Sequence, residues 1–301
     1  MNFAQLLFPD FSLILCGYLI CRYTAIDRTV WEQVETLVYY VLFPVLLFHS
    51  IARSPLDWGA ASGLIAAGLL LGLSGIAMAY VLPHVPFLRT HIDAREHAAS
   101  AQVAFRFNSY IALALAERLA GPQGLLLIAV LIGVCVPLFN VAAVWPMARH
   151  GNTGFGKALL KNPLIIATAV GLTANVAGLQ IPVWLDPTLG RIGAASLALG
   201  LMAAGAGLRL GSLAQNKALS VSLLCIKHLL MPLVAFALAR AFSLDATQTT
   251  VLLAFAALPT ASSCYVLASR MGYNGAYVAG LVTLSTVLGV ASLSLALGLL
   301  R

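Results

Sequence analysis

A charged and amide-bearing segment lies in the middle of an apolar stretch that is long enough to cross a membrane. It consists of Arg106, Phe107, Asn108 and Ser109, with Tyr110 directly after them. An arginine at the centre of a membrane helix costs about 2.5–3.5 kcal/mol on insertion scales, so it normally faces a water-filled cavity or a polar partner. Its planar guanidinium can hold a carboxylate by two hydrogen bonds. The segment therefore predicts an anion path, and the alternative is an arginine that extends towards the membrane surface.

A second polar interruption occurs later in the chain, at residues 257–263, with the sequence Ala-Leu-Pro-Thr-Ala-Ser-Ser. A proline in mid-helix removes a backbone hydrogen bond and clashes with the carbonyl four residues before it, so Pro259 predicts an unwound or kinked helix. The hydroxyls of Thr260, Ser262 and Ser263 could bind a substrate. Pro259 alone is also compatible with an ordinary kink that neighbouring hydroxyls satisfy.

A third polar feature is the basic pair Lys227 and His228, in an apolar stretch without any acidic residue. Lys227 can stabilise the negative ends of broken helices, or it can bind substrate or take part in coupling. Both roles stay open. Helices that begin at the two interruptions would add N-termini, with their partial positive charge and unpaired N–H groups, to the charge of Arg106. These features together predict a site for a small organic anion.

The composition places these features in a membrane protein. Of the 301 residues, 61% are hydrophobic and only 9% are charged, which is too apolar for a soluble domain of this size. The apolar runs have helical length, and helices satisfy their own backbone hydrogen bonds in lipid. The first run begins at Phe3 without a basic segment before it or a cleavage signature after it, so we expect a retained helix. The predicted fold class is an all-α integral membrane protein.

Charged or Pro/Gly-rich interruptions divide the chain into ten expected transmembrane spans. The spans are residues 3–21, 31–51, 58–82, 97–119, 123–147, 162–180, 188–208, 217–239, 247–269 and 275–299. A first five-helix repeat occupies residues 1–148, a short linker follows at 149–160, and a second five-helix repeat occupies 161–301. Because five is odd, the second half enters the membrane in the opposite sense, as in an inverted repeat. The interruptions are expected at residues 107–110 and 257–263, in the fourth span of each half, and such a pair is typical of a transporter binding site.

The positions of Lys and Arg predict the orientation. Of the 17 basic residues, ten lie in the connections after odd-numbered spans, five lie on the opposite side, and Arg106 and Lys227 lie inside spans. The positive-inside rule then places the linker in the cytoplasm and both termini on the other side of the cell (inner) membrane. The basic residues are dispersed, so the net charge of +7 does not indicate nucleic-acid binding.

Five short motifs occur in order along spans two, four, six, eight and nine. They are Tyr40-Val41-Leu42-Phe43-Pro44-Val45-Leu46-Leu47-Phe48, Phe105-Arg106-Phe107-Asn108-Ser109-Tyr110-Ile111-Ala112-Leu113-Ala114, Lys161-Asn162-Pro163, Lys227 with Pro232, and Leu258-Pro259-Thr260-Ala261. With these motifs the chain resembles the auxin efflux carrier family of bacterial permeases, over nearly its whole length. Members of that family are similar to plant auxin exporters and to bacterial carriers of small dicarboxylates such as malate and malonate.

The resemblance implies more about the fold than the residues do alone. It implies that helices four and nine cross at their broken centres, that spans one, two, six and seven form a scaffold, and that the other six spans form a mobile unit. One departure concerns span four. Many relatives carry Gly and Pro after the Asn of this span, where the chain has Tyr110, Ala112 and Ala114.

The residues favour one function among several. No Asp or Glu lies at mid-membrane depth in spans four and nine, whereas a sodium site usually includes a carboxylate. We therefore predict a secondary transporter that moves a small organic anion by alternating access. The alternatives are a sodium-coupled symporter of the bile-acid type and a membrane sensor or receptor. Proton coupling through Lys227 or His228 and potential-driven efflux both stay open, and a homodimer through span two or seven is compatible with the sequence.

An enzyme is not predicted. The sequence has no phosphate-binding glycine loop, no paired Glu/His metal motif and no serine nucleophile elbow. The five cysteines lack metal-ligand spacing and are interpreted as small apolar packing residues, so neither a metal nor a cofactor is expected. Asn140 is interpreted as a hydrogen-bonding partner of a neighbouring helix, and His49 as an interfacial or capping residue.

Overall fold

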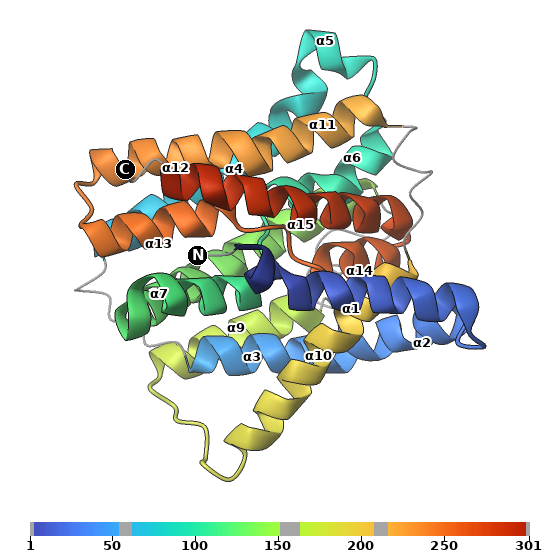
Figure 1. The fold of residues 1–301 in the computed structure, drawn as a ribbon, viewed down its shortest axis with the longest axis horizontal. Helices are drawn as coiled ribbons and strands as arrows, with labels where there is room; N and C mark the ends of the chain where they lie inside the picture. Colours follow the sequence, from blue (N-terminus) through green and yellow to red (C-terminus); the bar gives the residue numbers. More distant parts are fainter. Residues whose placement is uncertain (1–2, 54–61, 151–162, 208–215, 299–301) are drawn as a thin grey trace.

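The computed structural model describes residues 3–53, 62–150, 163–207 and 216–298, and these residues form helices and no β-strand (Figure 1). The α-helices are α1 Phe3–Tyr23, α2 Arg28–Leu37, α3 Phe43–Ala52, α4 Ser62–Val81, α5 Pro86–Arg89, α6 Ala94–Ser100, α7 Ser109–His150, α9 Pro163–Val176, α10 Asp186–Ala206, α11 Lys217–Cys225, α12 Met231–Ala241, α13 Ala246–Ala257, α14 Ser263–Arg270 and α15 Gly275–Gly298. Shorter turns of other helix types are η1 Val38–Leu42, η2 Leu82–His84, η3 Ala101–Ala104 and η5 Ile226–Leu230.

The prediction of an apolar, all-helical membrane protein is confirmed at this level. Within the described ranges, four helical segments are long and apolar enough to cross a membrane: Ser62–His84, Val130–Arg149, Lys217–Ala241 and Gly275–Gly298. The expected boundary between spans four and five also has a physical basis. Inside α7, Ala120 and Gly121 have non-helical backbone angles. Gly121 has a φ of +59°, a left-handed conformation that glycine adopts without strain, so α7 consists of two helices that meet at this point.

Three helices begin at an aspartate cap. The carboxylate of Asp27 accepts from two backbone N–H groups at the start of α2, Asp93 does so at the start of α6, and Asp245 accepts from Gln248 N at the start of α13. These are N-cap interactions, which satisfy donors that the helix itself leaves unpaired. Two of the caps, Asp93 and Asp245, begin the first halves of the two predicted broken spans.

Two helical spans contain a wider π turn directly before a proline. In η1, Phe43 N bonds to Val38 O, and Pro44 follows. In η5, Met231 N bonds to Ile226 O, and Pro232 follows. A proline cannot donate to the ladder of an α-helix, and π turns absorb such an interruption at places that are often functional. Lys227 and His228 both lie in the second of these turns.

The helices pack in two groups (Figure 1). In the first group α1 lies on α10, and α3 lies on α9 and α10. A polar cluster joins the end of α3 to α10, with the Asp186 carboxylate at 2.9 Å from His49 Nε2 and 3.2 Å from Arg53, directly after α3. In the second group α13 packs on α7 and α12, α4 packs on α7 and α12, and α14 packs on α15.

Replacing Gly17 by Ala is expected to destabilise the first group of helices. A Cβ at Gly17 would lie 1.8 Å from the carbonyl oxygen of Met202 on α10, so the two backbones must separate. We expect a loss of about 1–3 kcal/mol, measured as a lower melting temperature of the purified protein in detergent. Gly63→Ala is the matched control, because its Cβ would meet only a Leu244 methyl at 3.4 Å. Equal melting of both variants would contradict the close approach of α1 and α10.

Candidate functional site

The helix of span nine is broken at Pro259. The helix α13 ends at Ala257, and α14 begins at Ser263. Leu258, directly before the proline, has extended backbone angles (φ −57°, ψ 142°), which is the conformation that a following proline favours. The predicted interruption at residues 257–263 therefore lies where the sequence places it.

The break in span four lies two residues earlier than predicted. The interruption is expected at residues 107–110, but η3 ends at Ala104 and α7 already begins at Ser109. The reason is Asn108, whose side-chain oxygen accepts from Ile111 N (3.3 Å) and whose carbonyl accepts from Ala112 N (3.0 Å). Asn108 thus starts α7 as its N-cap. Tyr110 and Ala112 are helical, so no Gly or Pro is needed at these positions.

Hydrogen bonds join the two breaks to each other. Asn108 N donates to Pro259 O (2.9 Å), and the Thr260 hydroxyl donates to Val103 O (2.8 Å). The Gln102 amide donates to Cys264 O (3.0 Å). Backbone N–H and C=O groups that lose their helical partners at the breaks thereby form hydrogen bonds inside the protein. This is necessary because lipid offers them no partner.

Arg106 lies buried at this junction, with 6% of its surface exposed. Its guanidinium donates to Gln102 Oε1 (2.9 Å) and Asn140 Oδ1 (3.2 Å), and it also interacts with the Cys264 thiol. All these partners are uncharged. No ion pair of Arg106 with a carboxylate occurs in the part of the chain that the structure describes. Among the described residues, the charge is therefore held in place by neutral groups.

Lys227 is a second buried cation near the same junction, and only 1% of its surface is exposed. The Cys264 thiol interacts electrostatically with both Lys227 and Arg106, so the two basic side chains share one neighbour. Among the described residues Lys227 makes no ion pair. Buried charges are normally paired, so two basic side chains without a carboxylate partner among the described residues are an unusual arrangement.

His228, next to Lys227, holds the break of span nine. Its Nδ1 lies 2.9 Å from Ser292 Oγ, and its Nε2 lies 2.8 Å from Ser285 Oγ. Ser292 donates to Ala257 O (2.9 Å), the last residue of α13, while Ser285 accepts from Thr260 N (2.9 Å). Each ring nitrogen of His228 thus contacts a serine of α15, and each of these serines bonds to one side of the break.

Most of the predicted site residues of the two breaks are buried. Arg106, Asn108, Pro259, Thr260, Ser262 and Ser263 are buried, and Ser109 is half-buried; the side chain of Tyr110 lies outside the described residues. The hydroxyl of Ser262 is buried and has no hydrogen-bond partner in the described part of the protein. Such a group needs a partner, which a ligand or water can supply.

Sequence reasoning missed three residues that surround Arg106. Gln102 precedes the predicted motif, and Cys264 is predicted only as a packing residue. Asn140 is predicted to hydrogen-bond a neighbouring helix, which its contact with Arg106 confirms, but not to belong to the site. The Asn140 oxygen binds the guanidinium from a position 34 residues away. The i, i+4 spacing of Gln102 and Arg106 was the one available signal, because these positions share a helix face.

Replacing Thr260 by Val is expected to loosen the junction of the two breaks. Val keeps the shape but removes the hydroxyl that bonds to Val103 O and accepts from Ser285. Because a buried carbonyl loses its partner, we expect a loss of about 1–3 kcal/mol, measured by thermal unfolding in detergent. Thr250→Val is the control, since the Thr250 hydroxyl bonds only to Ala246 O in its own helix (2.8 Å). If the Thr260 variant were as stable as this control, the hydrogen bonds of the Thr260 hydroxyl would not stabilise the junction of the two breaks.

A family model described as membrane transport protein matches residues 90–297, which is more than half of the chain and includes both breaks. The chain belongs to this family of membrane transport proteins. The resemblance to the auxin efflux carriers is therefore confirmed at the level of the family. Membership points to a multi-pass membrane transporter rather than to an enzyme, and a transporter implies a small-molecule substrate and a lipid bilayer.

A curated relative covers nearly the whole chain. It is a protein of Rhizobium meliloti (strain 1021) named "Putative malonate transporter", which is 25% identical over 315 aligned residues. The alignment spans 98% of this chain and 95% of the relative. The similarity thus extends beyond the family match to the helices before residue 90.

Proposed function

We propose that the protein is a secondary carrier that moves a small organic anion, of the carboxylate class, by alternating access. The observation that carries the proposal is the pair Arg106 and Lys227, both buried beside Cys264 and both without a carboxylate partner among the described residues. A substrate carboxylate would supply the missing negative charge. Because there are two cations, a dicarboxylate is the best candidate, and the name of the Rhizobium relative makes malonate the first to test.

We assign separate roles to the residues of the junction. Arg106 and Lys227 bind the carboxylates, and Ser109, Ser262 and Ser263 supply hydrogen bonds near the N-termini of α7 and α14, where the helix dipoles favour an anion. Asn108, Pro259, Thr260 and His228 hold the two breaks, since their polar groups are already engaged within the protein. A contribution of Tyr110 stays a prediction.

The proposed mechanism needs two units that move against each other. We infer ten spans in two inverted repeats, with a scaffold of spans one, two, six and seven and a mobile unit that contains both breaks. The grouping of α1, α2, α3, α9 and α10 on one side, and of α4, α7, α12, α13 and α15 on the other, supports this division. Location in the cell (inner) membrane, with both termini outside the cytoplasm, remains the prediction from the distribution of Lys and Arg.

The test is uptake by purified protein in proteoliposomes. Radiolabelled malonate, malate, a monocarboxylate and indole-3-acetate are offered in turn, in sodium and in potassium buffers. Saturable uptake of a carboxylate that is equal in both buffers is the expected result. Uptake that requires sodium would instead support a symporter of the bile-acid type. Specific binding without uptake would support a sensor, and neither binding nor uptake of any anion by folded protein would contradict an anion carrier.

A further inference from the structure

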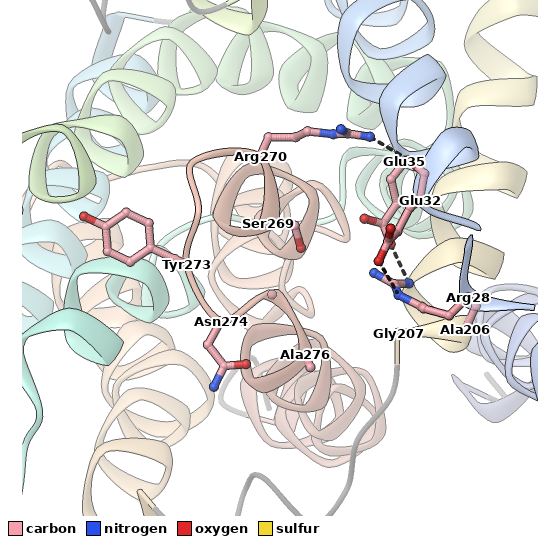
Figure 2. Close-up of a pocket in the computed structure, with 11 residues that line it drawn as sticks. Arg28, Glu32, Glu35, Ala206, Gly207, Ser269, Arg270, Tyr273, Asn274 and Ala276 are labelled. Carbon is pink, nitrogen blue, oxygen red and sulfur yellow. Dashed lines mark hydrogen bonds and ion pairs between the residues drawn. The ribbon is translucent and has the colours of Figure 1, made fainter. Parts of the chain in front are cut away.

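A polar cavity lies between the two groups of helices, away from the junction of the breaks. Its volume is about 490 Å³. Arg28, Glu32 and Glu35 of α2 line one wall, and Ser269 and Arg270 at the end of α14 line the other (Figure 2). On the α2 wall Arg28 lies 2.7 Å from the buried carboxylate of Glu35 and 3.8 Å from the carboxylate of Glu32, so one positive charge faces two negative ones. The positive-inside count places Arg28 and Arg270 on the cytoplasmic side.

Arg270 reaches across this cavity from α14 to α2. Its Nη2 donates to Glu32 O (2.8 Å) and to the Thr36 hydroxyl, and Figure 2 shows the side chain extended towards that helix. No carboxylate of the described residues forms an ion pair with Arg270, and its buried Nε has no acceptor. A guanidinium with an unused buried donor is incompletely satisfied, so this contact can be broken more easily than a bidentate ion pair.

Neighbouring polar contacts at the same end of the molecule stay within one group of helices. The segment after α14 is tied to α6 by Arg95, whose Nη2 donates to Gly272 O (2.9 Å), and by Asn274, which donates to Glu96 Oε1 (3.0 Å). The Tyr273 hydroxyl donates to Met147 O in α7 (2.6 Å). Arg270 differs from them because its bonds run from the proposed mobile unit to the proposed scaffold.

The helix α14 connects the cavity with the anion site. It begins beside Arg106 and Lys227 with Ser263 and Cys264, and it ends at the cavity with Ser269 and Arg270. Eight residues of α-helix span about 12 Å. Tyr39, in η1, is close enough to interact electrostatically with both Arg106 and Arg270. A movement of α14 away from α2 would therefore open a route along α14, from the cavity to the anion site.

We propose that the cavity is the aqueous entrance to the anion site and that Arg270 is its gate residue, which closes the entrance by tying α14 to α2. The identity of the substrate that passes this entrance rests on the proposed function. The closure depends only on the contact between α14 and α2. Breaking the Arg270 contact should expose the junction of the breaks to water-soluble reagents, whatever the substrate is.

The test uses Cys264 as a reporter, because this buried thiol lies beside Arg106 and Lys227. Cys16, Cys21, Cys135 and Cys225 are replaced by Ala, and the labelling rate of Cys264 by a charged methanethiosulfonate reagent is measured in permeabilised proteoliposomes. We expect Arg270→Gln to raise this rate at least tenfold. Thr36→Val, which removes one acceptor on the opposite helix, should raise it in the same direction. Arg95→Gln is the matched control, an arginine bonded to a carbonyl at the same end but within one group.

The labelling rates distinguish a gate from a general loosening of the helices. Faster labelling in Arg270→Gln and Thr36→Val, with Arg95→Gln within twofold of the parent, supports the gate even if no carboxylate is transported. Unchanged labelling in Thr36→Val and Arg270→Gln would overturn it, and so would an equal increase in Arg95→Gln, because the effect would then not depend on the contact with α2. Should Arg270→Gln not fold, Thr36→Val alone decides between these results.

Discussion

Arg106→Gln is expected to lower carboxylate transport by about tenfold to a hundredfold, because hydrogen bonds to a charged group contribute about 1.5–3 kcal/mol. Gln keeps a polar side chain that can still contact Gln102 and Asn140, whose oxygens now accept from the guanidinium at 2.9 and 3.2 Å. The fold should therefore persist while the charge that attracts the substrate is lost. The measurement is the concentration dependence of malonate uptake into proteoliposomes, with gel filtration as the check on folding.

The comparison for this variant is Arg118→Gln. Arg118 lies in α7 as well, but its side chain is exposed to the surroundings, so uptake should stay close to that of the unchanged protein. A loss in Arg106→Gln alone would locate the effect at the junction of the breaks. Equal uptake by both variants would show that Arg106 has a structural role only, and the anion site would then have to be sought elsewhere.

Lys227→Met is expected to change stability and transport in opposite directions. The ammonium is buried without an ion pair among the described residues, and a lysine at the centre of a membrane helix costs about 2.5–3.5 kcal/mol. Met has a similar length and no charge, so we expect the free energy of unfolding to rise by about 1–3 kcal/mol. Uptake of carboxylates should fall to the background of empty liposomes. A binding site that is retained at the expense of stability gives this combination.

Lys217→Met provides the reference for the second variant. Lys217 is exposed at the start of α11, in the same expected span as Lys227. Its replacement should leave both the melting temperature and the uptake rate nearly unchanged. If Lys227→Met were less stable than Lys217→Met, then Lys227 would be paired in the native state, and its proposed contact with substrate would be wrong.

The accuracy of the sequence interpretation depended on whether a signal is local. A proline in mid-helix removes a backbone hydrogen bond, so the break of span nine could be predicted to within one residue at each end. The break of span four has no proline, and it ends where Asn108 caps α7. A run of polar residues indicates such a break but does not say which of them is the cap, so the prediction is displaced by two residues. The hydrogen bond from Asn108 N to Pro259 O joins segments 151 residues apart, and no pattern in one sequence encodes that contact.

The buried basic residues were easier to find in the sequence than the residues that surround them. Arg106 and Lys227 are conspicuous because charges are rare in apolar spans. Asn140 and Cys264 belong to other segments, and only the folded chain brings them to the guanidinium. Arg270 illustrates a different limitation. In the sequence, Arg270 contributes only to the prediction of membrane orientation. Its contact between α14 and α2 is made to the backbone carbonyl of Glu32. Because every residue has a backbone carbonyl, the sequence gives no sign of this contact.

The absence of a carboxylate beside Arg106 and Lys227 in the described residues has a kinetic consequence. For a dianionic substrate, the loaded carrier is electrically compensated, and the empty carrier holds excess positive charge in a medium of low dielectric constant. Return of the empty form then becomes the slow half of the cycle, and each uncompensated charge that crosses the field adds about 2.3 kcal/mol per 100 mV. Substrate on the far side removes that barrier. Such a carrier favours one-for-one exchange over net flux.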